Sequence, residues 1–230
     1  LLCGLKKPQT GTIDVDGCKP YDRLPSFLSD QFYLSDEVPA VNMKAEEYAV
    51  TYGKFWEGFD LGKFNEIMEV LENDPHQKMN KMSFGQLKKT YIAFALACNT
   101  KYLFMDEPTN GLDIPSKAQF RKAVTKYTRE DSVILISTHQ VRDLENIIDP
   151  IIILDRQDVL LNATIAEISE KLYFDYTTEK VEEALYSEMI PGGNIQVYLN
   201  QTEEESKVNI EALFNTVLKH KELIKGIFNK

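Results

Sequence analysis

The sequence has few cysteines and no long apolar run. Its three cysteines, Cys3, Cys18 and Cys98, are few and odd in number for 230 residues, which argues against a disulfide-stapled fold and favours reduced thiols in the cytoplasm. No stretch approaches the roughly 18 apolar residues that a membrane-spanning helix needs. The first residues, LLCGLKKPQTG, are too short and too interrupted for a signal peptide. We therefore expect a chain that does not cross a membrane by itself.

Positive charge is also scarce. The chain has 26 lysines and arginines against 36 acidic residues, which gives a formal net charge of −10. A surplus of acid disfavours broad contact with nucleic acid or anionic lipid, so no nucleic-acid partner is expected. The length allows one sizeable domain, alone or with an appendage.

A third absence is a phosphate-binding loop of the form G-x-x-x-x-G-K-[ST]. The Gly-Lys pair occurs only at Gly53-Lys54 and Gly62-Lys63. Each pair is followed by phenylalanine, and neither has a glycine five residues before its own glycine. Neither pair can therefore cradle a phosphate.

The most informative stretch that is present is YLFMDEPTNGLD, residues 102–113. Its four leading apolar residues are typical of a short strand buried on both faces of a parallel sheet. In open α/β sheets ligands bind beyond the carboxyl ends of the strands, which is where Asp106 and Glu107 emerge. One carboxylate there can hold hydrated Mg²⁺ and its neighbour can orient an attacking water. Two solvated acids at a strand end would give the same pattern.

Two further segments indicate the same kind of site. Ser83 is a candidate N-cap of a helix whose apolar residues recur with helical spacing as far as Cys98. Gly85 lets the backbone approach a ligand closely, so the N–H groups and dipole of this helix start can bind an anion. Residues 133–136, VILI, predict a second buried strand, and His139 follows its carboxyl end.

These motifs resemble, in order and spacing, those of the ABC-type ATPase family. Residues 82–86 (MSFGQ) are similar to its signature sequence, residues 102–107 to the Walker B strand with its following glutamate, residues 110–113 to the D-loop, and His139 to the switch histidine. The resemblance covers most of residues 1 to about 160. It implies an α/β fold, with a P-loop NTPase core of the ABC type, a mainly parallel sheet, an inserted helical subdomain and a small α+β C-terminal appendage.

Local patterns supply the expected boundaries. Strands at 102–106, 132–137 and 150–154 alternate with helices at 115–129 and 140–147, as in a parallel α/β core. Further strands are expected at 12–17 and 32–34, and helices at 43–55 and 61–71. The prediction is an ATPase domain at 1–160, with its core at 1–37 and 100–160 and its helical subdomain at 38–99, followed by an appendage at 161–230.

The resemblance implies a role for each residue on the strand side of the site. Glu107 resembles the catalytic base, which polarises the water that attacks the γ-phosphate of ATP. Asp106 is similar to the metal-binding aspartate, which usually acts on Mg²⁺ through water. His139 resembles the histidine that hydrogen-bonds the γ-phosphate and senses its loss.

The resemblance also implies a second ATP-binding subunit, in a homo- or heterodimer arranged head to tail. Ser83, Gly85 and Gln86 would act on nucleotide held by that subunit. Asp113 would couple the two halves across the interface, or would only cap the following helix.

The chain departs from the family at two positions. Phe84 replaces the usual glycine at the third signature position. Asp36 stands where the family has the Q-loop glutamine, and an aspartate can meet Mg²⁺ or water but cannot donate a hydrogen bond as an amide does. Asp36 is thus either part of the nucleotide site or a solvated loop acid.

The family also explains the missing phosphate loop. Its P-loop runs into a helix that continues as L-x-G-L…P…G-x-I…D-G, and this continuation is matched by Leu2, Gly4, Leu5, Pro8, Gly11, Ile13, Asp16 and Gly17. The expectation is a chain that begins inside that helix, with the phosphate-gripping lysine and the Mg²⁺-binding Ser or Thr encoded upstream. Truncation is the most economical interpretation.

Three functional hypotheses remain open. The leading one is the ATP-hydrolysing subunit of an ABC transporter, which docks on a separate membrane-spanning permease through the region around Asp36 and residues 43–71, at the cytoplasmic face of the cell membrane. The second is a soluble ABC-type ATPase that acts on ribosomes or DNA. The third treats this chain, without a phosphate cradle, as a catalytically incompetent fragment or interaction module.

Overall fold

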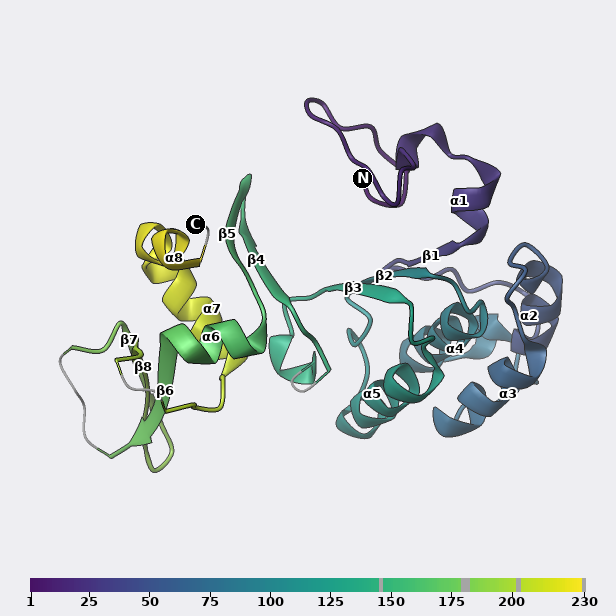
Figure 1. Cartoon of the computed structure of the whole chain (residues 1–230). Coiled ribbons are helices and arrows are strands. Elements are labelled where there is room, and N and C mark those ends of the chain that lie inside the picture. The colour runs from purple at the N-terminus through teal and green to yellow at the C-terminus, as the bar shows by residue number, and fades with distance from the viewer. Residues whose placement is uncertain (145–146, 179–182, 202–203, 229–230) are drawn as a thin grey trace. The chain divides into compact units, whose positions relative to one another are not determined.

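The computed structural model describes residues 1–144, 147–178, 183–201 and 204–228 of the chain (Figure 1). The chain forms two compact units, Leu1–Asp143 and Leu144–Lys230. The sequence places its change of character later, at about residue 161. No helix in the described ranges combines the length and the apolar character that crossing a membrane would require.

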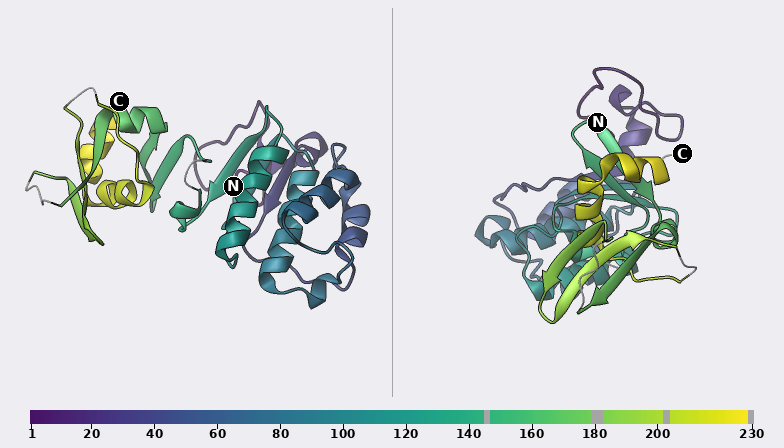
Figure 2. Two further views of the ribbon diagram at one scale, coloured as in Figure 1. Left: turned by 90° about the horizontal axis from the view of Figure 1, so that it is seen from below. Right: turned by 90° about the vertical axis from the view of Figure 1, so that its left-hand side faces the viewer.

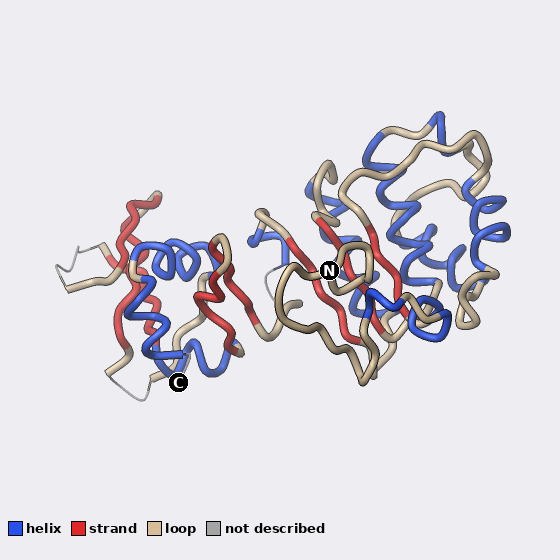
Figure 3. The backbone as a smooth tube through the Cα atoms, turned by 90° about the horizontal axis from the view of Figure 1, so that it is seen from above, coloured by secondary structure: helices blue, strands red, loops and turns tan. Residues whose placement is uncertain are grey.

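The first unit contains a three-stranded parallel sheet in the order β1-β2-β3 (Figure 3). Its strands are β1 (Gln31–Leu34), β2 (Tyr102–Asp106) and β3 (Val133–Ser137), which confirms the three strands predicted there. Leu34 pairs with Met105, and Met105 pairs with Ile136. This register brings the carboxyl ends of all three strands to one edge of the sheet.

The N-terminal segment covers one face of β2. Tyr102 and Phe104 are buried with Phe27 of α1 (Pro25–Ser29), and Figure 1 shows this segment on the side of the sheet away from α4 and α5. Apolar side chains on both faces exclude water from β2 and bury the four apolar residues that precede Asp106.

The prediction that residues 133–136 form a second buried strand was wrong in one respect. Val133 and Leu135 are 53% and 39% exposed, although the segment is a strand. Their partners in the register are Tyr102 and Phe104, so they share the face on which Phe27 packs. The packing on that face centres on β2, and β3 lies at the edge of the described sheet, where its apolar side chains stay open.

The helical part of this unit follows β1. It consists of α2 (Ala45–Gly53), α3 (Leu61–Val70), the 3-10 turn η2 (Met79–Lys81) and α4 (Phe84–Ala97). Helices α2, α3 and α4 pack against one another, and α4 also contacts β1. Phe64, Ile67 and Met68 of α3 are fully buried between them. The predicted helices at 43–55 and 61–71 are thus confirmed; α2 begins and ends two residues inside its predicted range, and α3 ends one residue early.

The segments after β2 carry the second half of the site. Helix α5 (Ile114–Tyr127) begins at its N-cap Asp113 and has Pro115 in its first turn, where a missing N–H costs nothing. The 3-10 turn η3 (Val141–Leu144) follows β3. It occupies part of the helix predicted at 140–147, of which residues 145–146 lie outside the described residues.

The strand predicted at residues 12–17 does not form. The structure has a single bridge between Val15 and Cys18, and the intervening turn is held by a bond from the Gly17 N–H to the Asp14 carboxylate. Gly17 adopts a φ of +78°, which glycine reaches without a steric penalty. The alternation of apolar and polar residues is too short to compete with this turn.

The second unit begins with an antiparallel hairpin of β4 (Ile151–Asp155) and β5 (Asp158–Ala163). Helix α6 (Ile165–Lys171) then leads to the antiparallel sheet β6-β8-β7, whose strands are Leu172–Thr177, Gly193–Leu199 and Tyr186–Ile190. Helix α7 (Ile210–Lys219) packs on β7 and β8, and α8 (Lys221–Phe228) packs on β5. Figure 2 shows this sheet and the two helices from two further directions.

The strand predicted at 150–154 is present, but its predicted place in the parallel core was wrong. Strand β4 pairs antiparallel with β5, because only two residues connect the two strands and so short a connection can join only antiparallel neighbours. The mixture of helices and antiparallel strands after it confirms an α+β appendage.

Candidate functional site

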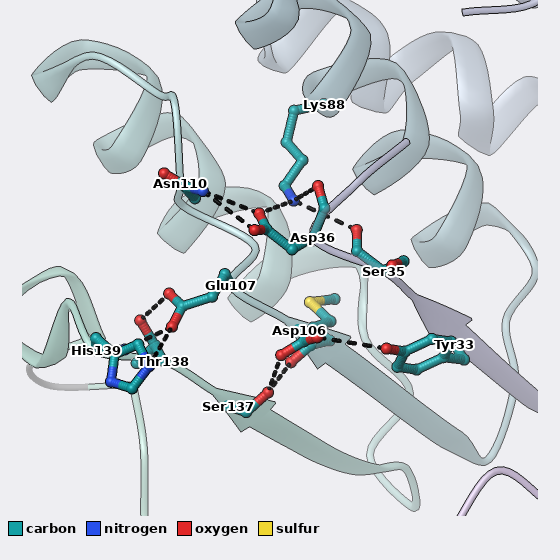
Figure 4. A network of polar contacts seen from close by, with 11 residues as sticks. Tyr33, Ser35, Asp36, Lys88, Asp106, Glu107, Asn110, Ser137, Thr138 and His139 are labelled. Atoms are coloured by element: carbon teal, nitrogen blue, oxygen red, sulfur yellow. Dashed lines mark hydrogen bonds and ion pairs between the residues drawn. The ribbon is translucent and has the colours of Figure 1, made fainter. Parts of the chain in front are cut away.

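The carboxyl ends of β1, β2 and β3 bring together most of the residues that the sequence singles out (Figure 4). Asp106 is the last residue of β2 and lies opposite Ser137 of β3. The Ser137 hydroxyl donates a 2.6 Å hydrogen bond to Oδ1 of Asp106, and the Tyr33 hydroxyl lies 3.4 Å from Oδ2. Both carboxylate oxygens are therefore oriented by neighbouring strands, and each keeps a lone pair for another partner.

Tyr33 is a neutral hydrogen-bond donor at this end of the sheet. Partial burial, and then the negative charge of Asp106, raise the pKa of the Tyr33 phenol. Both effects disfavour a phenolate. Tyr33 therefore stays a hydrogen-bond donor toward Asp106 at physiological pH.

Glu107 is held in a left-handed backbone conformation directly after β2. Its φ is +44°, which is uncommon and costs energy for a residue with a side chain. The Glu107 N–H donates to the Ser137 carbonyl at 2.9 Å, which fixes this turn against β3. The conformation points the side chain away from the strand axis toward the segment after β3.

Both carboxylate oxygens of Glu107 are held by that segment. The Thr138 hydroxyl donates to Oε2 at 2.8 Å, and the His139 backbone N–H donates to Oε1 at 2.7 Å. The Glu107 side chain is 16% exposed. The structure therefore brings the predicted base and the predicted switch histidine together, with the carboxylate fixed from two sides.

The His139 ring itself faces solvent. Its side chain is 97% exposed, and its Nε2 atom lies 3.8 Å from Oε1 of Glu107. The backbone of His139 is thus used to orient Glu107, while its imidazole is open to a ligand beyond the strand ends.

The start of α4 has the cap that the sequence predicts. Ser83 Oγ accepts a hydrogen bond from the Gln86 N–H, and the Gln86 side chain accepts one from the Ser83 N–H. This reciprocal capping box satisfies two of the orphan donors at the helix N-terminus. Ser83 remains exposed, so its hydroxyl lies at the surface.

Phe84 and Gly85 lie against the D-loop of the same chain. A Cβ atom added at Gly111 would lie 2.4 Å from the Phe84 ring, and one added at Gly85 would lie 3.1 Å from the Gly111 carbonyl. The Phe84 ring is nevertheless 48% exposed. The bulky residue at the third signature position is accommodated because it covers a glycine of residues 110–113.

Asp113 has the capping contact that was one of its two predicted roles. Its Oδ1 atom accepts a 2.9 Å bond from the Ser116 N–H at the start of α5. Hydrogen bonds from Ser116 lower the pKa of Asp113, so the carboxylate stays ionised. A role across a subunit interface remains a prediction, and the side chain is exposed there.

Asp36 lies beyond β1 and is engaged by two other elements. Asn110 Nδ2 donates to its Oδ1 and Oδ2 atoms at 3.0 and 3.3 Å, and Lys88 Nζ of α4 lies 3.2 Å from Oδ1. Asn110 first, and then Lys88, hold the pKa of the Asp36 carboxyl below its usual range. Whether Asp36 also contacts a nucleotide remains a prediction.

The residues present fit part of a Mg²⁺–nucleotide site. No group of three or more His, Cys, Asp or Glu side chains in the described part of the chain could hold a metal ion by itself. Mg²⁺ in phosphoryl-transfer sites needs only one or two carboxylates, because water and phosphate oxygens fill the other positions. Asp106 can supply one such contact through water.

Several partners in this site were missed from the sequence. The sequence did not single out Ser137, Thr138 or Tyr33, yet they orient the two acids. Lys88 could have been found, because it lies three residues before Tyr91 and so shares the buried face of α4. A lysine on an apolar helix face needs a hydrogen-bond acceptor when it is buried. No such pattern in the sequence indicates the contact of Asn110 with Asp36.

Comparison with known proteins finds relatives of one kind, the ATP-binding proteins of ABC transporters. Residues 1–110 match a family model described as ABC transporter. The chain is 24% identical over 205 residues to the ABC transporter ATP-binding protein NatA of Bacillus subtilis, covering 84% of this chain and 79% of NatA. It is 28% identical over 154 residues to the bacitracin transport ATP-binding protein BcrA of Bacillus licheniformis, covering 65% of this chain and 50% of BcrA. The chain thus spans only half the length of BcrA.

Solved structures share the fold. A putative cobalt transport ATP-binding protein aligns with 99% of this chain and 81% of its own, with a TM-score of 0.59 and 18% identity. A dimeric ATP-binding cassette, solved in a post-hydrolysis state with ADP and phosphate, aligns with 61% of this chain and 67% of its own, with a TM-score of 0.53 and 23% identity.

The parallel sheet with its flanking helices is an α/β arrangement of the kind found in the solved ATP-binding proteins, and Asp106 and Glu107 lie at the end of its central strand. The family match and the relatives make the assignment specific. Residues 1–110 match the ABC transporter family model, and the relatives and structural neighbours support a nucleotide-binding domain of the ABC-type ATPase family.

Proposed function

We propose that this chain is the ATP-binding and ATP-hydrolysing part of an ABC transporter subunit, and that ATP hydrolysis powers transport through a separate membrane-spanning permease. The observation that carries the proposal is the Glu107 carboxylate, which Thr138 and His139 hold from two sides beside Asp106. The names of the matched relatives, which include a bacitracin transport and a cobalt import ATP-binding protein, support a role in transport.

Glu107 is the proposed general base. A water placed against its free lone pairs loses a proton to the carboxylate as the water attacks the γ-phosphate of ATP. Mg²⁺, when bound, neutralises charge that develops on the phosphate oxygens. Asp106 would hold that ion through water, and the exposed His139 ring would donate a hydrogen bond to the γ-phosphate.

A second ATP-binding subunit completes this proposed site. Ser83, Gly85 and Gln86 would face nucleotide held by that subunit, and Asp113 would contact it across the interface. The exposure of Ser83 and Asp113 supports this arrangement, as does the dimeric state of a structural relative. The phosphate-gripping loop is not among the residues of this chain, so the proposal applies to the protein in which these residues occur with such a loop.

The permease is proposed to dock in a groove beside β1. The groove has a volume of about 480 Å³ and is mainly apolar. Its lining comes from the N-terminal segment, β1, residues 35–39 and the helical part, and includes Leu5, Glu37, Pro39, Tyr48 and Trp56. An apolar groove rimmed by a few polar groups is suited to a helix or loop of a partner protein. Docking there would place the protein at the cytoplasmic face of the membrane.

The test is purification of the full protein from its own cells with its partners, followed by an ATPase assay. The proposal expects Mg²⁺-dependent release of phosphate and a co-purifying membrane protein. A Glu37→Lys, Pro39→Arg variant should lose that partner but keep its fold. Co-purification with ribosomes or DNA, or an absence of ATP hydrolysis, would contradict the proposal.

A further inference from the structure

Lys88 is a fully buried cation on α4, which we call the signature helix because it begins within residues 82–86. Its side chain is 0% exposed, and it lies in the second turn of α4, four residues after the exposed Phe84. Burial lowers the pKa of the Lys88 ammonium, and Asp36 opposes that shift. A buried ammonium is tolerated only where hydrogen-bond acceptors replace its water. The acceptors around Lys88 therefore indicate its role in the structure.

Among the described residues, the hydrogen-bond acceptors of Lys88 all come from the loop after β1. Nζ donates to the Asp36 carbonyl at 2.7 Å, to the Asp36 carboxylate at 3.2 Å and to the Ser35 carbonyl at 3.4 Å. One helical turn further along α4, the Tyr91 hydroxyl donates to the Pro39 carbonyl at 2.9 Å. The loop at residues 35–39 is thus attached to the signature helix at both of its ends.

The same loop is attached to the segment that carries Glu107. Asn110 Nδ2 donates to both carboxylate oxygens of Asp36, and the Asn110 N–H donates to the Glu107 carbonyl at 3.1 Å. Figure 4 shows Asp36 between Lys88 on one side and Asn110 on the other. A continuous chain of contacts therefore runs from α4 through Asp36 to the turn that holds Glu107.

This arrangement leaves Asp36 poorly suited to bind a metal ion. Its Oδ1 atom already accepts bonds from Lys88 and Asn110, and a second cation beside the ammonium would be repelled. A glutamine could not pair with the buried lysine in the same way, because an amide carries no charge. The aspartate at this position and the lysine of α4 therefore form a matched pair.

We propose that Lys88, Asp36 and Asn110 form a clamp that couples the position of the signature helix to the position of Glu107 within one chain. Asp36 is then a positioning residue rather than a ligand of the nucleotide or its metal. A displacement of α4, or of the loop at 35–39 by a partner in the adjacent groove, is transmitted to the base through Asn110. This inference rests on the proposed ATPase function for its effect on rate, but the mechanical coupling can be tested without activity.

The first experiment measures hydrogen exchange at the backbone amides of residues 107–113. Lys88→Met keeps the length and apolar stem of the side chain and removes the three donors. The matched control is Lys63→Met, since Lys63 is a partly buried lysine that bonds the Asn99 side chain away from this loop. Faster exchange at 107–113 in Lys88→Met, but not in Lys63→Met, is the expected result. Equal exchange in the two variants would overturn the clamp, whether or not the protein hydrolyses ATP.

The second experiment measures steady-state ATP hydrolysis by the full protein. Asn110→Ala removes the link to Asp36 from a partly exposed position and leaves Lys88 paired. Since small misplacements of a catalytic group can cost up to about a hundredfold in rate, kcat should fall by roughly ten- to a hundredfold while KM for Mg-ATP stays unchanged. Lys88→Met should lower kcat in the same way, and the double variant should be no worse than either single variant, because the two residues act through one clamp.

The outcomes separate the two proposals. A rise in KM for Mg-ATP in Asp36→Asn with kcat unchanged would make Asp36 a nucleotide or metal ligand and overturn the clamp. A wild-type protein that hydrolyses no ATP would contradict the proposed function, and the hydrogen-exchange comparison would still decide for or against the clamp.

Discussion

The backbone N–H of His139 donates a 2.7 Å hydrogen bond to Oε1 of Glu107. The residue predicted to sense the γ-phosphate therefore also fixes the predicted base, through its main chain, while its ring stays open to solvent. Any movement of the segment after β3 must change the orientation of the Glu107 carboxylate. The geometry of this pair supports an account in which sensing and proton abstraction are coupled at one strand end.

Thr138 provides the first test of that orientation. Thr138→Val keeps the shape of the side chain and removes the hydroxyl that donates to Oε2 of Glu107. Hydrogen bonds to charged groups contribute about 1.5–3 kcal/mol, so we expect kcat to fall by roughly tenfold or more, with the fold unchanged by circular dichroism. Thr128→Val is the control, since the Thr128 hydroxyl donates to the Val124 carbonyl of α5, away from the site. Equal activity of Thr138→Val and the control would contradict a role for this bond.

The contact between Phe84 and Gly111 gives a second prediction. In Gly111→Ala the new methyl group would meet the Phe84 ring at 2.4 Å, at a φ of +76° that alanine adopts with strain. We expect a loss of about 1–3 kcal/mol in the free energy of unfolding. Adding Phe84→Gly should recover only part of this loss, because the ring clash disappears and the backbone strain remains. Full recovery, or no loss in the single variant, in urea unfolding would count against this packing.

The acid dependence of stability tests the environment of Asp36. The folded pKa of Asp36 is lowered, chiefly by Asn110 and then by Lys88. A carboxyl with a lowered folded pKa stabilises the chain above the unfolded value of about 3.9, and this contribution is lost as pH falls through the folded value. The difference in unfolding free energy between wild type and Asp36→Asn should therefore be largest near neutral pH and shrink below about pH 4.

Asn110→Ala is the companion variant in that titration. It removes the largest cause of the shift and keeps Lys88, so it should show a weaker loss of stability in acid than the wild type. Chemical denaturation at a series of pH values measures both differences. Curves that run parallel for the three proteins would contradict the assigned contacts.

The sequence predicts best the elements whose own residues indicate how they are buried. The four apolar residues before Asp106 form β2, and Ser83 caps α4, because these local patterns agree with the packing around them. The pairing of β4 could not be predicted from its pattern, since an apolar strand has the same composition beside a parallel or an antiparallel neighbour. The exposure of Val133 depends on how far the N-terminal segment covers the sheet, and the residues of β3 alone do not determine that.

The site divides in the same way. Asp106, Glu107 and His139 were predicted because residues at carboxyl ends of parallel strands meet at one edge of the sheet. Their hydrogen-bond partners were not, since Asn110 and Asp36 are 74 residues apart and Lys88 and Asp36 are 52 apart. Contacts over such separations are fixed by sheet register and helix packing, which a motif does not contain.

The most direct test of the central claim is single-turnover ATP hydrolysis by the full protein and its Glu107→Gln variant, each in excess over Mg-ATP and at a concentration that binds all of the nucleotide. Glutamine keeps the size of the side chain, and its amide oxygen can still accept the bond from the His139 N–H. It cannot accept a proton as a carboxylate does, and a general base contributes roughly 10²–10⁴-fold. The account predicts a loss of that size in the hydrolysis rate with ATP binding retained. Hydrolysis by Glu107→Gln at the wild-type rate would contradict it.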